Sequence, residues 1–162
     1  MQFFTFEWWQ DCQHGRPPDP FAIYRAHLES IRHRVPPDLL RLTDEQALHD
    51  GELRMLEHDV RSTSLTLEID GADHLGMLRR CRIAYKGVTS FRIQMDPDRY
   101  ICMPGFGNFG YDEVDLMLDG RLQHRFIFCT GIEMSIDFTT CDVRREDFPH
   151  TAREGSDRES RG

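Results

Sequence analysis

A glycine-rich loop in the second half of the chain has the spacing of a nucleotide-binding motif. Gly105, Gly107 and Gly110 stand in the order G-x-G-x-x-G. In a dinucleotide-binding fold a helix follows these glycines, because its N-terminus contacts the pyrophosphate. Residues 111–118 instead alternate apolar and polar side chains, as a strand does, and the companion motifs of a protein kinase do not occur. The spacing therefore does not indicate nucleotide binding.

The same loop carries aromatic and amide side chains that are suited to contact with another protein. Glycine permits unusual backbone angles, and aromatic rings supply contact area. The candidate binding residues are Phe106, Asn108, Phe109 and Tyr111. The alternative is a long connection between two strands whose phenylalanines pack back onto the core. The sequence leaves both interpretations open.

A histidine followed by an aspartate suggests a second kind of chemistry. His49 and Asp50 form such a pair, and His58 and Asp59 form another. Imidazole and carboxylate together can bind Zn²⁺ or Mn²⁺, or can act as a general base with an orienting acid. The candidate metal ligands are His49 and Asp50. The alternative is a helix end, where His49 stabilises the last carbonyl groups and Asp50 begins a turn.

Other residues with reactive side chains give no sign of a cofactor. The five cysteines are widely spaced and include no C-x-x-C pair, so neither a disulfide framework nor a zinc ribbon is indicated. His124 alternates with apolar residues from Leu122 to Phe128, which predicts a hydrogen-bonded core histidine rather than a ligand. We expect the protein to need no cofactor.

Composition and charge limit the partners. The chain has 162 residues, which fits one domain, and no stretch approaches the roughly 20 apolar residues of a membrane helix. The N-terminus lacks the features of a signal peptide, so we expect a cytoplasmic protein that does not bind membranes. The net charge of −8 argues against a nucleic-acid partner and suits a basic partner protein. Oligomeric state is not indicated.

Helix signals are confined to the first third of the chain. Thr5 can cap a short helix that reaches Cys12, and Asp19 before Pro20 predicts a helix over residues 20–34. A short helical turn is expected over 38–42. Thr43 begins a capping-box pattern that predicts another short helix ending near residue 50. These helices position the aromatic residues of the N-terminus against the rest of the fold.

After residue 51 the hydrophobic period changes to two. Alternating segments predict strands near residues 53–55, 65–69, 77–86, 91–95, 111–118, 122–128 and 132–138. The expected fold is an α+β domain over 1–148, in which helices within 1–50 pack on a six- to seven-stranded antiparallel meander over 52–145. The sheet could also curl toward a barrel. Residues 149–162 are expected to be a disordered tail.

Short segments resemble known bacterial proteins. Residues 3–9, FFTFEWW, and 48–53, LHDGEL, resemble an uncharacterised bacterial family that begins F-F-T-K-E-W-Y and carries L-H-D before a β-sheet. Phe6 stands where that family has lysine. Residues 111–114, YDEV, and 132–136, IEMSI, resemble small immunity proteins of bacterial toxin systems. The resemblance implies a protein that binds a toxin, and it transfers no catalytic residue.

The sequence is therefore consistent with three functions. The first is a non-enzymatic, immunity-like module that binds a partner protein through its acidic surface or its aromatic loop. The second is a small metal-dependent hydrolase that uses His49 and Asp50. The third is a small-molecule binder that uses the mouth of a curled sheet.

Overall fold

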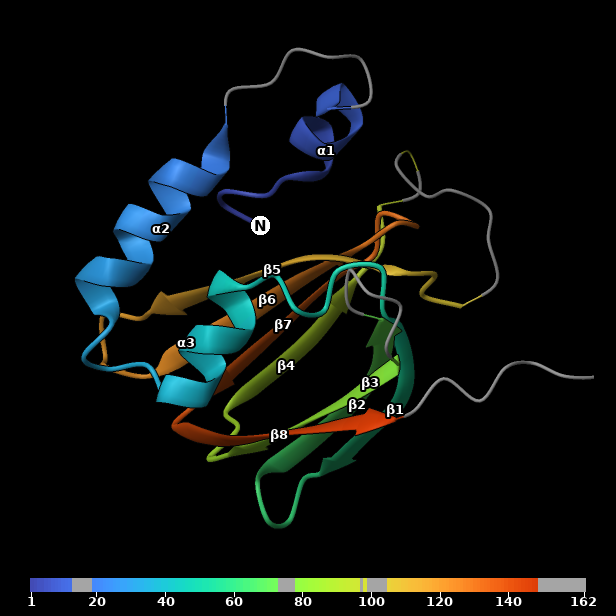
Figure 1. The fold of residues 1–162 in the computed structure, drawn as a ribbon. Coiled ribbons are helices and arrows are strands. Elements are labelled where there is room, and N and C mark those ends of the chain that lie inside the picture. Colours follow the sequence, from blue (N-terminus) through green and yellow to red (C-terminus); the bar gives the residue numbers. More distant parts are fainter. Residues whose placement is uncertain (13–18, 73–77, 97, 99–104, 149–162) are drawn as a thin grey trace, which may run out of the picture.

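The part of the chain that the structure describes forms two antiparallel sheets and three helices (Figure 1). The computed structural model describes residues 1–12, 19–72, 78–96, 98 and 105–148. The helices are α1 (Phe6–Cys12), α2 (Pro20–Ile31) and α3 (Pro37–Asp44). The strands are β1 (Glu52–Asp59), β2 (Ser64–Ala72), β3 (Leu78–Lys86), β4 (Ser90–Gln94), β5 (Phe109–Leu116), β6 (Leu122–Phe128), β7 (Glu133–Phe138) and β8 (Thr140–Phe148). The predicted α+β class is confirmed.

The predicted single meander of six or seven strands is wrong. The first sheet has the order β1-β2-β3-β8, and the second has the order β4-β7-β6-β5. Neither sheet closes into a barrel. The alternation of the sequence locates the strands but does not show that they divide into two sheets, because side chains alternate in the same way in both.

One continuous pair of strands bends from the first sheet into the second. Only Thr139 separates β7 from β8, and only residues 87–89 separate β3 from β4. The Thr139 N–H donates to the Lys86 carbonyl at 3.0 Å, so pairing continues through the bend. Gly87 has a φ of 63°, and a Cβ at this position would collide with the Thr139 side chain. The corner replaces a hairpin turn, which explains why β8 was not predicted as a separate strand.

The hydrophobic core lies between the two sheets. Tyr85 of β3 meets Phe138 of β7 edge to face, with ring centroids 4.9 Å apart. Helix α3 contacts the edge strands β8 and β5, and its Leu39 and Leu42 are fully buried. In this position α3 covers the open side between the sheets, as Figure 1 shows. Burial of apolar surface is the main stabilising contribution at such a site.

The helix signals were correct for α1, for α2, which ends at Ile31 rather than at residue 34, and for the helical turn over 38–42, which lies within α3. An additional helix was predicted after Thr43. The Thr5 hydroxyl accepts from the Trp8 N–H at 3.2 Å, and the Asp19 carboxylate accepts from the Phe21 N–H at 2.9 Å. The predicted helix after Thr43 is wrong, because Thr43 belongs to the last turn of α3. Its hydroxyl is buried and bonds the Tyr24 hydroxyl at 3.0 Å, so it is not available as an N-cap.

A buried carboxylate fixes the N-terminal segment to the second sheet. The Glu113 side chain is fully buried on β5 and accepts from the backbone N–H groups of residues 2, 3 and 4, at distances from 2.6 to 3.0 Å. Arg125 Nη2 lies 3.3 Å from the same carboxylate. The Met1 amine contacts Glu133 at 2.8 Å. These bonds satisfy donors and a charge that would be costly to bury alone.

Two further predictions concern membrane-spanning helices and the end of the chain. None of the described helices is long and apolar enough to span a membrane. The predicted disordered tail, residues 149–162, lies outside the described residues.

The cysteines give a test of this core. Burial raises the pKa of Cys81 to about 12 and that of Cys141 to about 12. At pH 8 only about one such thiol in ten thousand would be a thiolate, which is the reactive form. Cys12 is exposed. We expect iodoacetamide to alkylate Cys12 in the native protein and to spare Cys81 and Cys141 until urea unfolds it, as followed by mass spectrometry. Equal native rates for the three thiols would contradict this core.

The Glu113 anchor gives a second test. We expect Glu113→Gln to lower the free energy of unfolding by about 2–3 kcal/mol, because it removes the charge-assisted bonds to the three N–H groups and leaves Arg125 less well paired. The measurement is urea unfolding followed by circular dichroism. Glu57→Gln is the control, since Glu57 is exposed on β1. Equal stability of the two variants would show that Glu113 is not an anchor.

Candidate functional site

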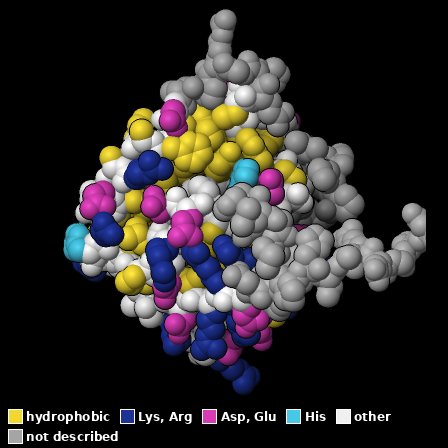
Figure 2. All heavy atoms as spheres, viewed as in Figure 1, with side chains coloured by type: hydrophobic (Ala, Val, Ile, Leu, Met, Phe, Trp, Pro, Cys, Tyr) yellow, Lys and Arg dark blue, Asp and Glu magenta, His cyan; other side chains and the backbone are white. Residues whose placement is uncertain are grey.

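Aromatic rings from three separate parts of the chain meet around Tyr111. Ring centroids of five residues lie between 4.8 and 5.9 Å from the Tyr111 ring: Phe4, Trp8, Trp9, Phe21 and His49. Phe4 is fully buried beneath the cluster, whereas the other four and Tyr111 are half-buried. We call Trp8, Trp9, Phe21, His49 and Tyr111 the Tyr111 surface. Figure 2 shows apolar side chains gathered on this face of the molecule.

A β-bulge at Gly110 directs Tyr111 to the outside. Phe109 pairs with Phe128, whereas Tyr111 pairs with the adjacent residue Ile127, so Gly110 is an extra residue in β5. Phe109 therefore points into the core and Tyr111 points away from it. Glycine is required here because the Trp9 ring lies directly over the backbone. A Cβ at Gly110 would lie 2.5 Å from the Trp9 ring.

The structure separates the four binding residues predicted from the loop. Phe109 is fully buried, and Phe106 is half-buried with its ring centroid 4.9 Å from that of Phe128. Asn108 is exposed, and its N–H donates to the Cys129 sulfur at 3.1 Å. Of the four, Tyr111 alone belongs to the aromatic cluster. The phenylalanines pack toward the core, which is the second of the two interpretations that the sequence left open.

His49, the predicted metal ligand, lies beside Tyr111. The turn that carries it is held by two backbone bonds, from the Asp50 N–H to the Phe109 carbonyl at 2.8 Å and from the Phe109 N–H to the Gly51 carbonyl at 2.6 Å. His49 Nδ1 lies 2.6 Å from the Gly110 carbonyl, which can only accept, so Nδ1 is the donor. Two residues that the sequence assigned to different functions thus lie on one surface.

The surroundings of His49 resemble a contact surface more than a metal site. His49 Nε2 lies 3.9 Å from an Asp50 carboxylate oxygen. Within the described ranges, no three His, Cys, Asp or Glu side chains lie close enough to hold a metal ion together. The Asp50 side chain is 78 % exposed. The predicted helix end at this point is a turn, since α3 ends at Asp44.

Acidic residues are close in sequence to several members of the Tyr111 surface, and Asp50 is also close to it in space. Glu7 and Asp11 are exposed on α1, beside the two tryptophans in sequence, and Asp50 projects next to His49. Partial burial raises the pKa of the Tyr111 hydroxyl, and the nearby Cys12 and Asp50 raise it further. The hydroxyl therefore stays protonated and can donate a hydrogen bond at neutral pH. The surface combines apolar rings, hydrogen-bonding groups and negative charge.

A buried chain of polar side chains was not predicted from the sequence as a unit. His124 Nδ1 lies 2.8 Å from the Tyr85 hydroxyl, and His124 Nε2 lies 3.0 Å from an Asp112 carboxylate oxygen. All three side chains are buried, and burial raises the pKa of Tyr85 well above its usual value. The prediction that His124 is a hydrogen-bonded core residue is confirmed. These hydrogen-bonded side chains link β3 of the first sheet to β5 and β6 of the second sheet.

The close packing of Trp9 on Gly110 can be tested directly. We expect Gly110→Ala to displace Trp9 and α1, because the added methyl group would overlap the ring. The measurement is tryptophan fluorescence, which should shift to longer wavelength as the indole enters water. Gly71→Ala is the matched control, since a Cβ there meets nothing nearer than 3.6 Å. An unchanged spectrum for Gly110→Ala would contradict the packing described.

The sequence was also compared with known proteins. No protein-family model matches the chain, and no curated protein matches it either. What this protein does must therefore be inferred from the chemistry of its own surface.

Proposed function

We propose that this protein is a non-enzymatic module that binds a basic partner protein through the Tyr111 surface. The observation that carries the proposal is the half-buried group of Trp8, Trp9 and Tyr111, with the exposed carboxylate of Asp50 beside it. Tryptophan and tyrosine dominate the residues that contribute most to protein–protein binding. A partner with an apolar anchor surrounded by Lys or Arg would match this arrangement.

The rigidity of the surface supports binding. The rings contact one another and rest on Gly110 and the buried Phe4, so their side chains have few alternative rotamers. Ordering flexible side chains at an interface costs about 0.5–1.5 kcal/mol each. A surface that is already ordered avoids much of this loss. The exposed carboxylates would in addition accelerate association with a basic partner.

We also propose that the partner is a basic bacterial toxin. The resemblance of residues 111–114 to immunity proteins supports a bacterial toxin, and the net charge of −8 suits a basic one. We further propose that the protein acts in the bacterial cytoplasm, where an immunity protein would meet its toxin. In this role the protein would block the toxin by occupying its surface and would need no catalytic group or cofactor.

The two other functions have less support from the geometry. His49 uses Nδ1 for the Gly110 carbonyl and has only Asp50 near Nε2, so a metal-dependent hydrolase would need ligands beyond the described residues. A small-molecule site between the sheets would have to displace core side chains, since Phe126, Phe128 and Phe138 fill that space and are fully buried. Neither arrangement offers a surface comparable to the one around Tyr111.

A matched set of variants tests the proposal. We expect wild-type protein on a resin to retain a basic partner from an extract of its source cells, and Trp9→Ala to weaken the purified complex by about 30-fold or more, as measured by calorimetry. Asp50→Asn should slow association without changing the fold. Leu118→Ala is the control, because Leu118 is a fully exposed apolar residue at the other end of β5.

The affinities of these variants can be compared only if each variant is folded. Circular dichroism and urea unfolding must show that Trp9→Ala remains folded under the binding conditions. A partner that binds Trp9→Ala and Leu118→Ala with the same affinity would reject the Tyr111 surface. Hydrolytic activity that needs added Zn²⁺ or Mn²⁺ and is lost in His49→Ala would instead favour the metal-dependent enzyme.

A further inference from the structure

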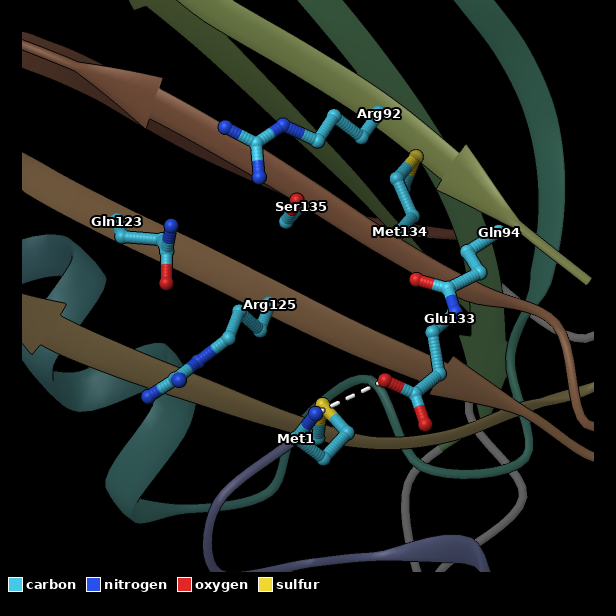
Figure 3. Close-up of a pocket in the computed structure, with 8 residues that line it drawn as sticks. All are labelled: Met1, Arg92, Gln94, Gln123, Arg125, Glu133, Met134 and Ser135. Atoms are coloured by element: carbon cyan, nitrogen blue, oxygen red, sulfur yellow. Dashed lines mark hydrogen bonds and ion pairs between the residues drawn. The ribbon is translucent and has the colours of Figure 1, made fainter.

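A polar hollow lies on the outer face of the second sheet. It has a volume of about 200 Å³ and is lined by residues from the N-terminus and from β4, β6 and β7: Met1, Arg92, Gln94, Gln123, Arg125, Glu133, Met134 and Ser135 (Figure 3). The lining contains three positively charged groups, which are the Met1 amine, Arg92 and Arg125. It contains one carboxylate, that of Glu133. Two of these positive groups are paired with carboxylates, the Met1 amine with Glu133 and Arg125 with Glu113 and Asp115, so Arg92 is the cation of this hollow that matters for a ligand.

Strand register brings two arginines to the sides of one hydroxyl. Arg92 pairs with Ser135, and Ser135 pairs with Arg125 on its other side. Side chains that are directly opposite in neighbouring strands have Cβ atoms about 4.5–5.5 Å apart and lie on the same face. Figure 3 shows the Arg92 side chain extending from β4 across β7 toward Ser135 and Gln123. The three side chains thus form one row across the sheet.

The positive charge of Arg92 is not neutralised by a neighbour. Its Nε donates to the Ser90 hydroxyl at 3.1 Å, and no carboxylate in the described part of the chain pairs with its guanidinium. Arg125 differs, because its Nη2 lies 3.1 Å from Asp115 and 3.3 Å from Glu113. Glu133 is occupied by the Met1 amine. Arg92 is therefore the positively charged group of this hollow that no described carboxylate neutralises, and it can bind an anionic ligand.

Further donors remain unused beside Arg92. The Ser135 hydroxyl has no hydrogen-bond partner among the described residues, and neither has the buried Nε of Arg125. A guanidinium presents paired N–H groups that match the spacing of carboxylate and phosphate oxygens. A hydroxyl and a second guanidinium at its side can satisfy the remaining oxygens. Within the described residues, the Arg92 guanidinium lacks a carboxylate partner and the Ser135 hydroxyl lacks a hydrogen-bond partner, so these two groups are available to an anion.

We propose that this hollow binds the phosphate or carboxylate group of a small molecule. Arg92 makes the charged contact, Ser135 donates a hydrogen bond, and Arg125, which Glu113 and Asp115 hold in place, forms one side of the hollow. The site is separate from the Tyr111 surface, and the proposal does not depend on the binding of a partner protein.

Inorganic phosphate and acetate serve as the probes. We expect saturable shifts of the amide signals of residues 92, 125 and 135 in heteronuclear NMR spectra when either anion is added, compared with sodium chloride at the same ionic strength. Arg92→Gln should weaken this binding by about tenfold or more, because it removes a charge-assisted interaction. Ser135→Ala should weaken it by a smaller factor.

Arg61→Gln is the matched control, because Arg61 is an exposed arginine in the turn between β1 and β2. It carries the same change in charge and should bind both probes as the wild type does. The proposal is overturned if neither anion shifts the signals more than sodium chloride does. It is equally overturned if Arg61→Gln and Arg92→Gln lose the same affinity.

Discussion

The extra residue at Gly110 decides which face of the second sheet each following side chain of β5 reaches. After the bulge, Tyr111 points outward, Asp112 points into the core and Glu113 points outward again. The Tyr111 ring contacts the aromatic cluster, and Asp112 forms a hydrogen bond with His124. The Glu113 carboxylate accepts hydrogen bonds from the N-terminal segment. A regular strand would exchange these faces, and each polar group would lose its partners.

The two buried carboxylates of β5 differ in how fully they are paired. Glu113 accepts three backbone N–H groups and faces Arg125, so its desolvation is offset by charge-assisted bonds. Asp112 has one carboxylate oxygen bonded to His124, while its other oxygen has no partner among the described residues. A buried polar group without a partner costs free energy. His124, which bonds Asp112 through one ring nitrogen and Tyr85 through the other, connects the two sheets at this point.

Local signals in the sequence located the three helices and most strands, although the capping-box pattern at Thr43 predicted one helix that does not form. Asp19 before Pro20 marked the start of α2, and Asp119-Gly120 marked the turn between β5 and β6. Long-range features were not accessible in this way. The bend at Thr139 has no turn motif, so β8 and the division into two sheets were missed. Tyr111 and His49 were each named as site residues. The bulge that separates the directions of Phe109 and Tyr111 depends on how β5 pairs with β6, and the contact of His49 with β5 joins residues 61 positions apart in the sequence.

The corner at Gly87 and Thr139 has a mechanical consequence. Because β3 continues into β4 and β7 continues into β8, the two sheets share a hydrogen-bonded ribbon rather than a flexible linker. Separating the two sheets at this corner would break hydrogen bonds of that ribbon. The strands that carry Arg92 and Ser135 are thus joined through the backbone to β3 and β8, so a displacement of the first sheet at this edge reaches them through bonded atoms.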